Sequence, residues 1–123
     1  MTRSPVVGSP YEASGTLPLT LRPRRDEPAA RDLTALCGWL TGHADWVQAR
    51  LAEHGALRFR GFAVEGPRDF ERLARAIDDD LKNVYLGTSP RAALTDYVFN
   101  ASELPDYYPI PQHCEMSFCA RPP

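Results

Sequence analysis

The chain has 123 residues, of which 43% are hydrophobic, so it is long enough to form one domain with an apolar core. Fourteen Lys and Arg residues stand against 16 Asp and Glu, which gives a formal net charge of -2. A nucleic acid or an anionic membrane favours a protein with a marked basic excess, so this balance argues against both partners.

Export is also disfavoured. No apolar run is long enough to span a membrane, and the first residues carry neither the apolar core nor the cleavage site of a secretory signal. The three cysteines, Cys37, Cys114 and Cys119, are odd in number and contain no CxxC pair, which is typical of reduced thiols. We therefore expect a cytoplasmic protein.

Residues 1–30 form a loop-rich N-terminal segment in this interpretation, because they mix Pro, Gly, Ser, Thr and charged residues without a lasting period. Within them, residues 16–21 alternate well enough to predict one edge strand. The basic run at residues 21–25 is followed at once by Asp26 and Glu27, so we interpret it as a solvated flexible segment rather than a binding arm.

The middle of the chain carries the clearest helical patterns. Leucines share one face of a helix from Arg31 to Gly42, and a second helix through residues 46–51 is expected to end at Gly55. The alternation of residues 56–60 predicts a half-buried strand, and Pro67 then opens a third helix with an apolar stripe. The three carboxylates at residues 78–80 would point in different directions on a helix and could not easily bind one metal ion. Their place near the C-terminal end of the helix is unfavourable to the helix dipole, so we expect the helix to end early and leave them solvated.

Further strands are predicted near the C-terminus. Residues 94–99 are rich in strand formers and predict a second core strand, and a loop with Pro105 and Pro109 leads to a final strand. The order is helices, strand, helix, strand, loop and strand, without an internal repeat. It favours an α+β fold in which helices pack on one side of a mostly antiparallel sheet.

The final predicted strand carries the candidate chemistry. His113, Glu115 and Ser117 would share one of its faces, with Cys114 on the other. The Cα atoms of residues two apart on a strand are separated by roughly 6.5 to 7 Å, a span from which an imidazole and a carboxylate can both reach one divalent metal. His113 and Glu115 would supply two of the three ligands in the two-histidine, one-carboxylate triad of non-haem iron(II). From spacing alone, a solvated strand face is the commoner explanation of such a pair.

Two separate segments resemble the taurine dioxygenase-like (TauD/TfdA) family. Residues 54–62, HGALRFRGF, are similar to the family's HGxxxFRGF pattern, which a helix like the one from Pro67 follows. Residues 98–105 and 110–118 resemble its HxE-bearing branch, in particular members similar to syringomycin-biosynthesis hydroxylases. The resemblance covers roughly residues 31–118. It implies that residues 31–123 are an incomplete dioxygenase domain, the N-terminal part of a double-stranded β-helix, or jelly roll.

The resemblance also implies the ligands. His113 and Glu115 would bind Fe(II), with 2-oxoglutarate as co-substrate, in an enzyme that hydroxylates a small molecule. The family's second iron histidine and its 2-oxoglutarate-binding arginine have no match here, and His43 and His54 are assigned structural roles in the helical stretch. We therefore expect an N-terminal fragment that is marginally stable and inactive alone, and open to completion by a downstream polypeptide or by oligomerisation.

Several alternatives stay open. The chain could be a truncated gene product without independent function, or a non-catalytic interaction module. The metal-binding version of that module would hold zinc through His113, Cys114, Glu115 and Cys119. Near the site, Asn100 either faces the substrate or bonds the loop backbone, and Ser117 either donates to Glu115 or is a plain exposed residue.

Overall fold

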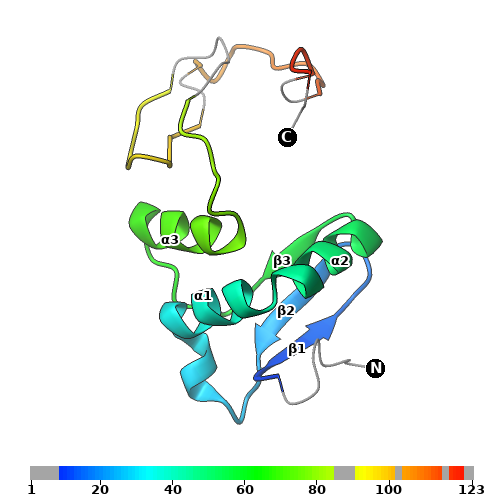
Figure 1. Ribbon diagram of the computed structural model, residues 1–123. Coiled ribbons are helices and arrows are strands. Elements are labelled where there is room, and N and C mark those ends of the chain that lie inside the picture. Colours follow the sequence, from blue (N-terminus) through cyan, green and yellow to red (C-terminus); the bar gives the residue numbers. More distant parts are fainter. Residues whose placement is uncertain (1–8, 85–90, 102–103, 115–116, 121–123) are drawn as a thin grey trace. The chain divides into compact units, whose positions relative to one another are not determined.

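The computed structural model describes residues 9–84, 91–101, 104–114 and 117–120. The chain divides into two compact units, Met1–Leu81 and Lys82–Pro123. All helices and strands of the described residues belong to the first unit (Figure 1).

The sheet of the first unit has three strands in the order β1-β2-β3. β1 (Tyr11–Ser14) runs antiparallel to β2 (Leu19–Pro23), and β2 runs parallel to β3 (Leu57–Phe59). The predicted edge strand is therefore wrong in its position, because β2 pairs on both sides. The sheet is also mixed rather than mostly antiparallel, since a helical crossover returns the chain to β2 in the same direction.

Four helical segments complete this unit: η1 (Pro28–Arg31), α1 (Leu33–Gly42), α2 (Ala44–His54) and α3 (Pro67–Ile77). The side chain of Asp32 accepts a hydrogen bond from the Ala35 amide at 3.0 Å and so caps α1. Gly55 ends α2 in the left-handed region at φ 70°, as its sequence position predicted. No helix in the described part of the chain is long and apolar enough to cross a membrane.

The end of α3 also follows its prediction. The helix stops at Ile77, and the three aspartates at residues 78–80 are exposed. The Asp80 amide donates to Oδ1 of Asp78 at 2.9 Å, so one of these carboxylates serves the local turn.

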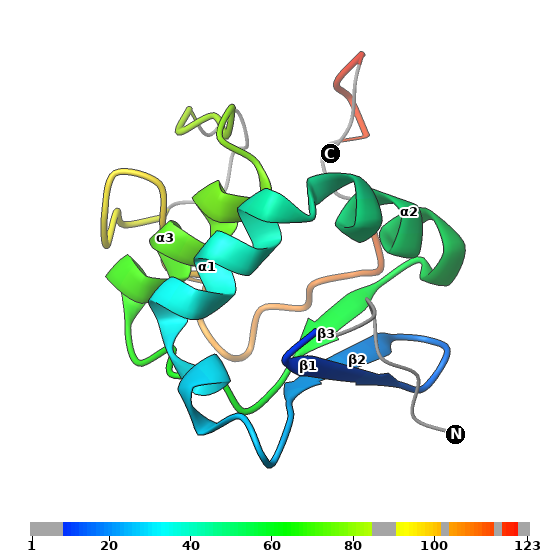
Figure 2. The same cartoon turned by 60° about the horizontal axis from the view of Figure 1, so that its bottom comes forward.

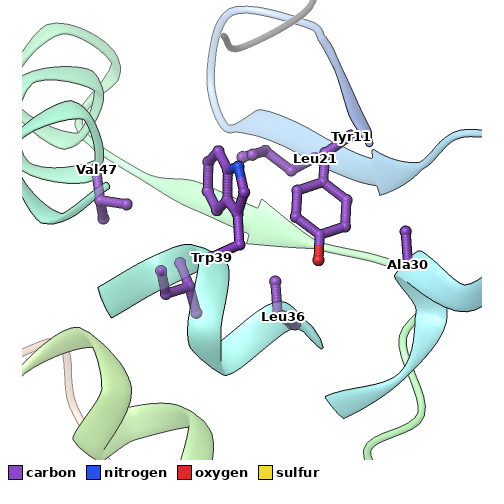
Figure 3. Packing of buried hydrophobic residues seen from close by; sticks show 7 residues of the cluster. Tyr11, Leu21, Ala30, Leu36, Trp39 and Val47 are labelled. Atoms are coloured by element: carbon purple, nitrogen blue, oxygen red, sulfur yellow. The ribbon is translucent and has the colours of Figure 1, made fainter. Parts of the chain in front are cut away.

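The core lies between the helices and one face of the sheet (Figure 2). Tyr11 and Leu21 from the sheet meet Leu36 and Trp39 from α1 (Figure 3). Leu40 of α1 belongs to the same cluster. The Tyr11 ring packs edge-on against Trp39 with ring centroids 5.1 Å apart. Burial of these apolar side chains is the main force that holds the helices on the sheet.

The strand β3 contributes to the same core. Leu57 and Phe59 are half-buried and pack against the core cluster. This agrees with the half-buried strand predicted for residues 56–60. Phe118 of the second unit, in contrast, is 70% exposed.

The second unit contains a tight turn where a core strand was predicted. Ala93 and Phe99 form an isolated antiparallel bridge. Between them, the Thr95 hydroxyl accepts from the amides of Tyr97 at 3.3 Å and Val98 at 3.0 Å. A Thr side chain that binds nearby amides competes with a strand ladder, which explains why residues 94–99 turn rather than extend.

Candidate metal centre

His113 lies on a stretch that makes no regular strand. Residues 110–114 form neither helix nor strand, and residues 117–120 form a turn. The strand predicted here is thus not formed in the described residues. Pro109 and Pro111 lack amide hydrogens, so this stretch cannot donate a full ladder. Glu115 lies outside the described residues, and its geometry with His113 stays a prediction.

The His113 ring has a defined orientation. Its side chain is exposed, and Nδ1 lies 2.9 Å from the carbonyl oxygen of Pro111. A carbonyl can only accept, so Nδ1 donates the proton, and in the neutral ring the lone pair is on Nε2. Metal-binding histidines commonly donate their second ring nitrogen to a carbonyl in this way. An imidazole is a ligand that Fe(II) accepts, so the chemistry and orientation of His113 fit the implied metal.

The zinc alternative receives no support from the cysteines. All three are free, with Cys114 exposed and Cys119 half-buried. Within the described ranges, no three His, Cys, Asp or Glu side chains come together as a group that could hold a metal. His113, Cys114 and Cys119 are therefore not assembled around one ion.

Asn100 bonds the loop backbone. Its side-chain Oδ1 accepts from the Ala92 backbone amide at 2.6 Å, and the backbone amide of Asn100 donates to the Ala92 carbonyl oxygen at 2.9 Å. These bonds confirm the structural alternative for this side chain. Ser117 is exposed in the turn at residues 117–120, and its relation to Glu115 lies outside the described residues.

The two remaining histidines have structural roles, as expected. His43 stacks on Trp39 with ring centroids 4.6 Å apart, and its Nδ1 lies 2.8 Å from the Trp39 carbonyl oxygen. Nδ1 of His54 lies 2.9 Å from the carbonyl oxygen of Thr16 and so ties α2 to the loop before β2. Neither ring belongs to the segment of His113.

The structure also shows a depression that sequence reasoning missed, between α1 and α3. Its lining consists of Cys37, Glu71, Arg72, Arg75, Ala76 and Asp79. Burial raises the pKa of the Cys37 thiol, while Arg72 opposes the shift. The thiol is therefore protonated at neutral pH and is not an activated nucleophile. The depression is lined by α1, by α3 and by Asp79 just after α3, so no local motif could have predicted it.

Comparison with known proteins decides the family. The family model described as "Taurine catabolism dioxygenase TauD, TfdA family" matches residues 17–123. The chain belongs to the TauD/TfdA family. This match begins within the first thirty residues and includes β2. TauD/TfdA membership implies a jelly-roll fold, of which the described residues show a three-stranded mixed sheet covered by helices.

A clavaminate synthase-like protein of Arabidopsis thaliana is a relative of this TauD/TfdA chain. The two are 36% identical over 72 residues, which cover 58% of this chain and 22% of the relative. The chain therefore spans only about a fifth of the length of the curated relative that it matches.

Proposed function

We propose that the chain supplies two protein ligands, His113 and Glu115, to Fe(II) in a 2-oxoglutarate-dependent dioxygenase that hydroxylates a small molecule. The observation that carries the proposal is the bond from Nδ1 of His113 to the Pro111 carbonyl, in a chain of the TauD/TfdA family. It makes Nε2 the nitrogen that can bind a metal. The HxE spacing supports, within this proposal, membership of the branch that uses glutamate as the iron carboxylate.

Each residue has a distinct task in this site. Fe(II) with 2-oxoglutarate and dioxygen supplies an oxidant strong enough for C–H bonds. Nε2 of His113 and a carboxylate oxygen of Glu115 hold the metal, and the Pro111 carbonyl keeps the imidazole from rotating. This proposal assigns no residue of the chain as the second iron histidine or as the 2-oxoglutarate arginine, so the chain alone is expected to be inactive.

The ligand assignment is tested by anaerobic titration of the full chain with Fe(II), in which calorimetry measures the binding affinity. His113→Ala and Glu115→Ala are each expected to weaken Fe(II) binding by about tenfold or more, because a directly binding group is lost. His54→Ala is the matched control, since it removes an imidazole that also bonds a carbonyl but lies on α2. It should leave the affinity unchanged within about twofold. Unchanged affinity in His113→Ala would remove this residue from the site.

The proposed inactivity needs a separate measurement. The chain with Fe(II), 2-oxoglutarate and oxygen is expected to form no succinate above the rate of Fe(II) without protein. Succinate formation that disappears in His113→Ala would show that the chain completes its own site, and the proposal of an external histidine would be abandoned.

A further inference from the structure

Arginines from two strands gather on the face of the sheet that points away from the core. Arg22 lies on β2, and Arg58 lies on β3. The register pairs Thr20 with Arg58, and the Arg60 amide donates to the Leu21 carbonyl oxygen at 3.0 Å. The ladder therefore continues beyond β3 and brings Arg60 beside Arg22.

Burial shows which face these side chains occupy. Leu19 and Leu21 are buried, and Leu57 and Phe59 are half-buried against the core. Since side chains alternate along a strand, Thr20 and Arg22 of β2 and Arg58 of β3 point to the opposite face, and Arg60 continues this alternation just beyond β3. On this face Thr20 is itself buried. Arg22, Arg58 and Arg60 are all exposed. We call these three residues the arginine face.

Neighbouring side chains orient the arginine face. Nε of Arg58 donates to the Thr20 hydroxyl at 3.2 Å, which directs its guanidinium across β2. Glu12 stands opposite Arg22 in the ladder and is the one carboxylate on this face among the residues of the three strands. Positive charge therefore dominates here although the whole chain has a net charge of -2.

We propose that the arginine face binds an acidic polypeptide segment in extended conformation, with carboxylates at alternate positions. Arg58 and Arg60 are two residues apart in extended chain, so their Cα atoms are separated by roughly 6.5 to 7 Å. Alternate carboxylates of an extended partner have the same spacing. The planar guanidinium can also accept a carboxylate through two parallel hydrogen bonds, which favours arginine over lysine at such a surface.

The chemistry of this face disfavours a nucleic acid. Single strands bind where aromatic side chains stack on the bases, and the residues that alternate outward on the three strands are Glu12, Ser14, Thr20, Arg22 and Arg58. None of these is aromatic. Glu12 can also pair with a cationic side chain of a protein partner, a group that a polyphosphate lacks.

Fluorescence anisotropy of the full chain with two labelled peptides tests the proposal. One peptide alternates Glu and Ser, and the other has the same composition with all Glu residues in one block. The alternating peptide is expected to bind more tightly. The double variant R58Q/R60Q should weaken its binding about fivefold, because two exposed charge pairs are lost.

The matched control is R68Q/R75Q, which removes the same charge from exposed positions on α3. It should leave binding unchanged within about twofold. R22Q alone provides a third variant that retains the bond from Arg58 to Thr20. Three results would overturn the proposal: no binding by the unmodified chain, equal losses in both double variants, or tighter binding of oligothymidylate that depends on Arg58 and Arg60.

Discussion

The hydroxyl of Tyr11 is an unusual group in this core. Tyr11 is 1% exposed, and its hydroxyl oxygen has no hydrogen-bond partner among the described residues. The ring itself is well packed, with edge-on contacts to Trp39 at 5.1 Å and to Phe62 at 5.4 Å. Tyr11→Phe would keep these ring contacts and remove only the unsatisfied polar group.

The substitution is therefore expected to stabilise the protein. A buried polar group without a partner costs about 1 to 3 kcal/mol. Part of this is offset by the small gap that loss of the oxygen leaves, so we expect the free energy of unfolding to rise by about 1 kcal/mol. For a unit of this size the melting temperature should rise by about 5 °C.

The effect should depend on pH. Burial, followed by the charges of Asp32 and Cys37, raises the pKa of Tyr11 above the ordinary value of 10.0. The folded chain then holds the phenol proton more firmly than the unfolded chain. The contribution of this pKa shift to the free energy of unfolding is fully present below pH 10.0 and is lost as the pH rises through the folded-state pKa. Tyr11→Phe lacks this loss, so the difference between the two proteins should widen in alkaline solution.

Urea denaturation followed by tryptophan fluorescence, near neutral pH and at about pH 10.5, measures both effects. Tyr107→Phe is the control, because Tyr107 is 85% exposed and its substitution should change stability by less than about 0.5 kcal/mol. A Tyr11→Phe protein less stable than the unmodified chain would show that the hydroxyl has a partner, and the reasoning would fail.

Substitutions at three further positions test the framework of the first unit by urea denaturation. Leu36→Ala should lower the free energy of unfolding by about 3 kcal/mol, because the side chain is 0% exposed and leaves a cavity; a loss under about 1 kcal/mol would contradict its place in the core. Asp32→Ala should lower it by about 1 kcal/mol through loss of the α1 cap, whereas Asp32→Asn should retain most of the stability. Gly55→Ala should lower it by about 1 kcal/mol because φ is 70°, and no loss would mean that α2 ends differently.

The elements that could be predicted are those with local signals. The spacing of apolar residues, together with Gly55 and Pro67, predicted the positions of α1, α2 and α3 to within a few residues. The alternation of residues 56–60 identified β3. Each of these signals acts within a few residues of the element it shapes. The early end of α3 before the aspartates was predicted for the same reason.

The errors concern pairing over long distances and side chains that bind amides. The central position of β2 depends on β3, which is far away in sequence, so alternation could not reveal it. Thr95 turns residues 94–99 through its hydroxyl, a contact that strand propensity ignores. For the site, the resemblance supplied His113 and Glu115, whereas the contact of the His113 ring with the Pro111 carbonyl depends on a backbone conformation that no sequence motif specifies.

The parallel pairing of β2 with β3 also bears on how the protein folds. The two strands are joined through η1, α1 and α2, so their contact closes a long loop, whereas β1 and β2 are close neighbours in sequence. Folding slows as contacts become more distant along the chain. We expect the β1–β2 hairpin to form first and β3 to join last, after α1 has shielded Leu21 from solvent. During synthesis the segments emerge from the ribosome in this same order, so the apolar face of the hairpin is covered only once α1 has followed it.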